Sequence, residues 1–98
     1  MFVKTQLRIY TINKGQLEQF ASEWAQKIRP LREKLGFQVL GAWTVPSTNQ
    51  FVWIMALEEG KNWDELDAAY FGSEERKAMQ PDPGRLIARM ENQFMEAV

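Results

Sequence analysis

The first segment of the chain alternates between two sets of side chains. One face of residues 3–12 carries Val3, Thr5, Leu7, Ile9 and Thr11, and the other carries Lys4, Gln6, Arg8, Tyr10 and Ile12. This period of two, together with the enrichment in Thr, Ile, Val and Tyr, predicts a strand. Asn13, Lys14 and Gly15 then supply the chemistry of a turn.

A helical period replaces the alternation over residues 17–35. Apolar side chains recur there every three or four positions, at Leu17, Phe20, Ala21, Trp24, Ile28, Leu31 and Leu35. This stripe predicts an amphipathic helix, and Gly36 is typical of its C-terminal cap. Pro30 has no backbone N–H to donate, so we expect one helix that bends near this residue.

Residues 37–45 and 51–57 are predicted to form a hairpin around a loop at residues 46–50. A symmetric loop would pair Trp43 with Trp53. One face would then carry Trp43, Phe51, Trp53 and Met55, and the other Leu40, Ala42, Val52, Ile54 and Ala56. Because both faces would be apolar, both need cover, and helices can cover only one of them.

The second half of the chain continues with helices and an ambiguous end. Asn62, followed by Glu65, predicts the start of a helix over residues 62–71. We expect a short helical piece over residues 73–79 and then a loop at residues 81–84. Residues 85–98 fit a strand and a helix about equally well. The order β-α-β-β-α favours a final strand, which gives one α+β domain over residues 1–98 with a ferredoxin-like βαββαβ antiparallel sheet.

Composition and charge narrow the classes of function. Twelve basic and thirteen acidic residues give a net charge of -1, so nothing in the charge favours a nucleic acid as partner. The chain has no cysteine and no histidine, and its acidic residues lack the spacing of metal ligands, so we expect no metal site and no cofactor. No signal peptide or membrane span is evident, which predicts a cytoplasmic location.

Several of these residues together resemble the NIPSNAP family. The resemblance is carried by residues 7–12 (LRIYTI), Gly15, Trp24, Pro30-Leu31, Gly36-Phe37 and Gly41-Ala42-Trp43, and it runs from about Gln6 to Met79. Gln6 stands where the common pattern has an acidic residue. The resemblance implies a dimeric α+β barrel, in which two sheets face each other across a homodimer. A second copy would then cover the remaining apolar face.

Arg8 and Tyr10 are the most distinctive candidates for a site. If their face is continuous with the face of Trp43, Trp53, Phe51 and Met55, the barrel encloses a cavity with aromatic walls, one cation and one phenol. Such a cavity suits a small aromatic or anionic ligand. Alternatively, the two tryptophans form a packing pair in the dimer core. Arg8 is either buried, and then needs a carboxylate or a ligand anion, or solvated at the rim.

Three functions remain open on this basis. The first is a NIPSNAP-like homodimer of uncharacterised activity that binds a small aromatic or anionic ligand in the barrel cavity. The second is a cofactor-independent monooxygenase or isomerase acting on an aromatic or lactone substrate, and the third is a protein-binding adaptor that uses Trp63 and Phe71. We interpret Arg29 and Arg32 as solvated, with the edge of an anion site as the alternative, and Tyr70 and Met90 as packing residues.

Overall fold

The structure, a computed structural model, describes residues 2–98, and its side chains are described for residues 4–98. The elements are β1 (Phe2–Ile12), α1 (Leu17–Glu23), the π-helical turn η1 (Trp24–Ile28), α2 (Arg29–Lys34), β2 (Gln38–Val45), the 3-10 turn η2 (Pro46–Thr48), β3 (Gln50–Glu58), α3 (Trp63–Gly72), α4 (Glu74–Lys77), the 3-10 turn η3 (Pro83–Leu86) and β4 (Ile87–Met95). The predicted order of elements is confirmed, and the ambiguous C-terminal segment is a strand.

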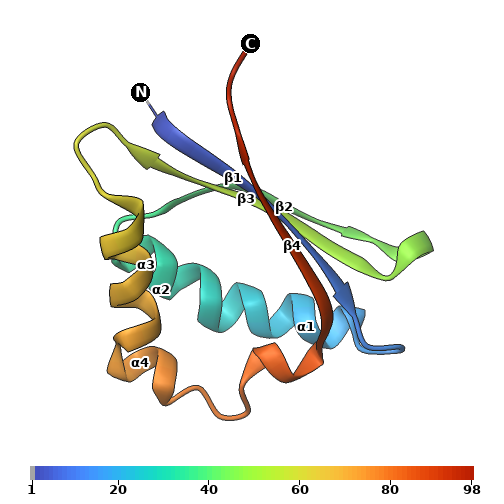
Figure 1. Cartoon of the computed structure of the whole chain (residues 1–98). Coiled ribbons are helices and arrows are strands. Elements are labelled where there is room, and N and C mark those ends of the chain that lie inside the picture. Colours follow the sequence, from blue (N-terminus) through green and yellow to red (C-terminus); the bar gives the residue numbers. More distant parts are fainter. Residues whose placement is uncertain (1) are drawn as a thin grey trace.

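The four strands form one antiparallel sheet in the order β2-β3-β1-β4. This order is that of the ferredoxin-like βαββαβ arrangement, as predicted. All the helices of residues 2–98 lie on one side of the sheet, and none of the helices and strands in these residues covers the other side (Figure 1). The start of β1 and the end of β4 lie at the same end of the sheet, because these two strands are antiparallel neighbours.

Near Pro30, where a bend is predicted, the first helix has a π-helical turn between α1 and α2. Pro30 cannot donate to the carbonyl four residues earlier, and its ring crowds that carbonyl. The turn just before it widens, so that the Arg29 N–H donates to the carbonyl of Trp24, five residues back. The helix therefore continues through the proline, and Trp24 and Ile28 both point into the core.

The largest apolar side chains of the sheet decide which of its faces the helices cover. The register of β1 and β3 pairs Arg8 with Trp53 and Tyr10 with Phe51, so these side chains share one face, as predicted. Trp53 and Met55 are fully buried on this face, and the ring of Trp53 packs against that of Trp24 in the first helix. The prediction that this face lines a barrel between two sheets is therefore wrong, since it lies beneath the helices of its own chain.

The predicted register of the hairpin is wrong by one residue. Asn49 adopts a left-handed conformation (φ 55°), which asparagine tolerates, and the loop therefore closes one residue earlier than a symmetric loop would. Trp43 consequently pairs with Val52 instead of Trp53. A shift of one residue moves a side chain to the other face of a sheet, so Trp43 lies on the open face and is 52% exposed.

The open face of the sheet is mainly apolar at its centre. Leu7 and Ile9 of β1 pair with Ile54 and Val52 of β3, and all four are only half-buried. Trp43 continues this surface on β2, where its ring lies over Gly41; a Cβ atom at Gly41 would be 2.5 Å from the ring. The expectation of two apolar faces, of which helices cover one, is thus confirmed.

Candidate functional site

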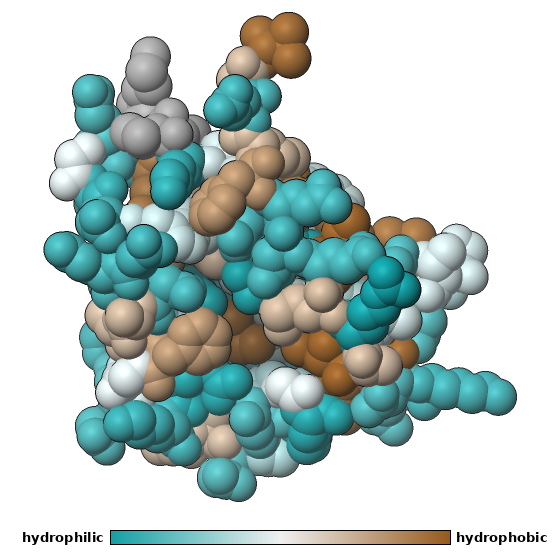
Figure 2. Space-filling view, in the orientation of Figure 1, coloured by the Kyte–Doolittle hydropathy of each residue, from teal (hydrophilic) through white to brown (hydrophobic). Residues whose placement is uncertain are grey.

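A small cavity of about 70 Å³ lies between the sheet and the helix layer. The residues around it come from β1, β3, β4, the first helix and the segment from α3 to η3: Arg8, Tyr10, Ile28, Arg32, Trp53, Tyr70, Phe71, Arg76, Gly84, Ile87 and Met90. The space-filling view in Figure 2 is hollowed between α3 and β4, with apolar atoms at the floor of the hollow. The lining therefore combines aromatic and aliphatic walls with three guanidinium groups.

Arg8 is the central cation of this cavity. Its side chain is on the helix-facing side of β1 and is only 6% exposed. It donates from Nε to the Tyr10 hydroxyl (2.8 Å), from Nη1 to Oε1 of Gln6 (2.7 Å) and from Nη2 to Sδ of Met90 (3.7 Å). All three partners are neutral. Among residues 4–98, no carboxylate forms an ion pair with Arg8.

Arg32 on α2 brings a second buried cation to the cavity. Its guanidinium is stacked on the ring of Tyr70, 3.6 Å from the ring centroid, and donates to Oδ1 of Asp67 at 2.8 Å. Burial lowers the pKa of Arg32, and the nearby charge of Arg8 acts in the same direction, whereas the hydrogen bond to Asp67 opposes both. Burial also raises the pKa of Tyr70, so its hydroxyl stays protonated beside the arginines.

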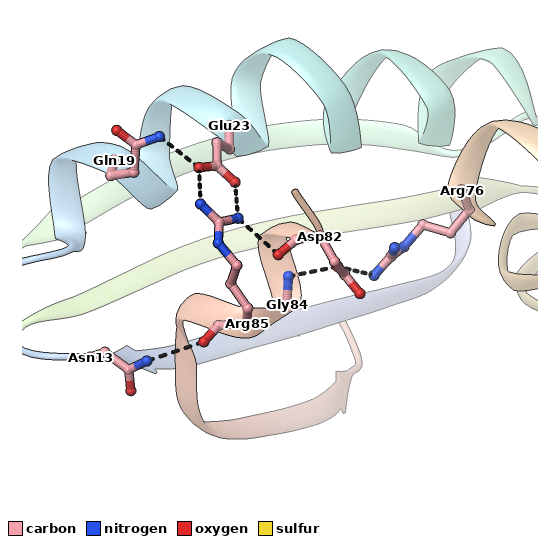
Figure 3. Close-up of polar contacts among 7 residues, drawn as sticks. All are labelled: Asn13, Gln19, Glu23, Arg76, Asp82, Gly84 and Arg85. Atoms are coloured by element: carbon pink, nitrogen blue, oxygen red, sulfur yellow. Dashed lines mark hydrogen bonds and ion pairs between the residues drawn. The ribbon is translucent and has the colours of Figure 1, made fainter. Parts of the chain in front are cut away.

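Arg76 at α4 is held in place by a chain of polar contacts (Figure 3). Its Nη2 donates to Oδ1 of Asp82 (3.0 Å), which also accepts from the backbone N–H of Gly84 (2.8 Å). The neighbouring Arg85 donates with both terminal nitrogens to the carboxylate of Glu23 on α1, at 2.7 and 2.8 Å. These contacts fasten the segment around η3, which carries part of the cavity wall, to the first helix.

The ion pair between Arg85 and Glu23 strongly favours the charged form of Glu23. Hydrogen bonds from Arg85 lower the pKa of the Glu23 carboxyl to about 2; burial acts in the opposite direction, and a hydrogen bond from Gln19 adds to the lowering. Glu23 is therefore ionised at any physiological pH. It neutralises Arg85, so Arg85 adds no net charge to the cavity nearby.

The cavity has more hydrogen-bond donors than acceptors. In the part of the chain with described side chains, the buried polar atoms without a partner are all N–H groups: Trp24 Nε1, Arg32 Nε, Trp53 Nε1 and Arg76 Nε. Three of these four residues line the cavity. Within residues 4–98, three guanidinium groups also face only two carboxylates, those of Asp67 and Asp82. The cavity thus has an excess of one positive charge and several unused donors.

The sequence predicts only part of this site. Arg8, Tyr10 and Trp53 line the cavity, whereas Phe51 and Met55 belong to the packed core beside it and Trp43 is on the opposite face of the sheet. Arg32 is 2% exposed, so the prediction that it is solvated is wrong. Its position gave a usable signal, because it lies on the apolar stripe of the helix, four residues after Ile28.

The features proposed for an adaptor surface are divided between the core and the surface. Trp63 is buried between the rings of Phe37 and Phe94, while Phe71 is exposed beside Arg32. Within residues 2–98, no cluster of three acidic, histidine or cysteine side chains could hold a metal ion. No helix in the same residues is long and apolar enough to cross a membrane.

The topology and the single helix layer define a ferredoxin-like α+β domain with a buried basic cavity. The NIPSNAP family model matches residues 5–98, and the chain belongs to this family. A search among curated proteins found no match.

Several solved structures have a similar fold. An uncharacterized NIPSNAP domain protein from Burkholderia xenovorans is 16% identical, with a TM-score of 0.85 over 98% of this chain and 95% of that chain. A NIPSNAP family protein from Agrobacterium tumefaciens is 14% identical, with a TM-score of 0.86 over 97% and 92% of the two chains. A candidate antibiotic biosynthesis monooxygenase from Bordetella bronchiseptica is 14% identical, with a TM-score of 0.72 over 100% and 99%. At these identities the similarity concerns the fold alone.

Proposed function

We propose that this protein binds a small organic carboxylate, as a monoanion, in the cavity between the sheet and the helices. The observation that supports this most directly is the burial of Arg8, whose hydrogen-bond partners among the described side chains are all neutral. An ion removed from water costs several kcal/mol, roughly, unless a charge of opposite sign compensates it. A bound carboxylate would supply that charge and would accept from donors that otherwise lack a partner.

The charge and size of the cavity support a small monoanion. One positive charge is in excess after Asp67 and Asp82 have been paired with Arg32 and Arg76. The volume of about 70 Å³ holds several water molecules or one carboxylate with a short chain. The fork of the Arg8 guanidinium suits the two oxygens of a carboxylate, and the ring of Trp53 gives an apolar wall for the attached carbon atoms.

A titration with acetate followed by nuclear magnetic resonance tests this proposal, with neutral acetamide as the control ligand. We expect saturable shifts at cavity residues with acetate, little effect of acetamide, and loss of acetate binding in Arg8→Met. Arg29→Met is the matched control, because it removes the same charge at an exposed site on the same protein. Equal acetate affinity in Arg8→Met and the wild type would contradict the proposal.

We also propose that a second copy of the chain covers the open face of the sheet. The half-buried Leu7, Ile9, Val52 and Ile54 and the exposed Trp43 support an apolar interface that is complementary to itself. Sedimentation should give a dimer for the wild type and a folded monomer for Ile54→Lys. Ala25→Lys, which adds the same charge on the outer side of the first helix, should remain a dimer. A monomeric wild type at micromolar concentration would refute this part.

Oxygenation or isomerisation of a larger aromatic or lactone substrate has less support. The cavity volume of about 70 Å³ is well below the roughly 300–1,000 Å³ of most ligand pockets. Oxygen uptake with a panel of quinol substrates separates this alternative from simple binding, since turnover that disappears in Arg8→Met would favour it. The cytoplasmic location stays a prediction of the sequence.

A further inference from the structure

A methionine forms the β4 side of the cavity and contacts its central cation. Met90 pairs with Tyr10 across the β1–β4 ladder, so its side chain is on the helix-facing side of the sheet. It is 45% exposed, it lines the cavity, and its sulfur accepts the 3.7 Å hydrogen bond from Nη2 of Arg8. A thioether is a weak acceptor. This contact therefore leaves the charge of Arg8 largely uncompensated.

We propose that Met90 is an oxidation site and that its sulfoxide closes the anion cavity. The inference rests on the proposed function, because it assigns a regulator to the same site. The oxidant is hydrogen peroxide. The thioether sulfur attacks one peroxide oxygen, an S–O bond forms and the O–O bond breaks. The sulfur loses two electrons, and the peroxide is reduced to water.

The position of the new oxygen gives this modification its effect. A sulfoxide oxygen carries partial negative charge and is a much stronger acceptor than a thioether. It would be attached to a sulfur that already contacts the Arg8 guanidinium, and it would occupy the place of a ligand carboxylate. The oxygen would also compensate the buried cation. Oxidation is therefore expected to reduce anion binding while stabilising the ligand-free protein.

Other methionines supply the comparison. Met55 is fully buried beneath the helices and is shielded from peroxide. Met95 is 36% exposed, similar to Met90, but it pairs with Thr5 and lies on the open face of the sheet. It therefore serves as a control on the same strand that does not contact the cavity, and mass spectrometry reports how far it is oxidised.

The first experiment compares acetate binding before and after peroxide treatment, with peptide mass spectrometry to identify the oxidised residues. Oxidation should weaken binding at least tenfold in the wild type and in Met95→Leu. In Met90→Leu, oxidation should leave the affinity of that variant unchanged. If Met90 is converted to the sulfoxide and the wild type binds acetate as before, the inference is wrong.

The second experiment needs no ligand. In Met90→Gln the amide oxygen stands in for the sulfoxide oxygen, and Met90→Leu has no acceptor. When Arg8 is present, we expect the melting temperature of Met90→Gln to exceed that of Met90→Leu by several degrees. In an Arg8→Met background, we expect this difference in melting temperature to be smaller. An equal difference in both backgrounds would overturn the inference. Failure of the unoxidised wild type to bind acetate would instead contradict the proposed function, so the two failures are distinguishable.

Discussion

Replacement of Glu23 by glutamine tests the ion pair that fastens the η3 segment to the first helix. The Glu23 carboxylate is buried and accepts two hydrogen bonds from Arg85, and its pKa is lowered from 4.5 to about 2. A shift of this size corresponds to about 3 kcal/mol of stability linked to the ionised form. Because the Arg85 side chain is 39% exposed, solvent screening reduces the expected loss in Glu23→Gln to about 1–3 kcal/mol at pH 7.

The pH dependence of that loss has a definite sign. The folded protein holds the Glu23 proton less tightly than the unfolded chain, so the ion pair stabilises the fold fully above pH 4.5. Its contribution should disappear as the pH falls from 4.5 towards about 2. Urea denaturation followed by tryptophan fluorescence, at a series of pH values from neutral to strongly acidic, measures the difference between wild type and Glu23→Gln. That difference should be largest near neutral pH and shrink in acid.

A second variant separates this effect from a general loss of surface charge. Glu33 forms an ion pair with Arg29 in which both side chains are nearly half exposed. Glu33→Gln should cost less than about 1 kcal/mol at any pH, as exposed pairs usually do. A loss in Glu23→Gln that is the same at strongly acidic and neutral pH would refute the assignment of this stability to the ionised Glu23.

Three further substitutions test packing, capping and buried charge, each measured by urea denaturation. Gly41→Ala places a Cβ atom 2.5 Å from the Trp43 ring and should cost about 1 kcal/mol, and this loss should disappear in a Trp43→Ala background. Asn62→Ala removes the side-chain cap of α3 and should cost about 1 kcal/mol. Asp67→Ala leaves the buried Arg32 guanidinium without its carboxylate and should cost about 2–3 kcal/mol.

Local patterns were sufficient to predict the elements and their order. The alternation in β1, the stripe of the first helix and the Asn62 cap all depend on neighbours a few residues apart in the chain. The C-terminal strand could not be predicted in this way, because Ile87–Met95 is an edge strand whose side chains are mostly exposed. Its pattern lacks the clear alternation that burial of one face imposes, and only the topology of the preceding elements favoured a strand.

The registers and the site depended on contacts that the local pattern does not contain. The left-handed Asn49 shortened the hairpin loop by one residue, which was enough to separate Trp43 from Trp53. Arg32 is buried by contacts with Asp67 and with the ring of Tyr70, both on α3. These residues lie at least 35 positions away in the sequence. A charge on an apolar helical stripe is the signal that could have predicted its burial.

The inverted pattern of β1 links the two proposed partners of this protein. A sheet with helices on one side usually turns its apolar residues inward and its polar residues outward. In β1, Gln6, Arg8 and Tyr10 point inward and are buried, while Leu7 and Ile9 point outward. This arrangement is unfavourable for an isolated chain. A bound anion would offset the cost of burying Arg8, and a second copy of the chain would cover Leu7 and Ile9. Adjacent substitutions should therefore separate the two effects: Arg8→Met should abolish acetate binding in a dimer, whereas Leu7→Lys should give a monomer. Loss of both properties in either variant would contradict this division between the two faces.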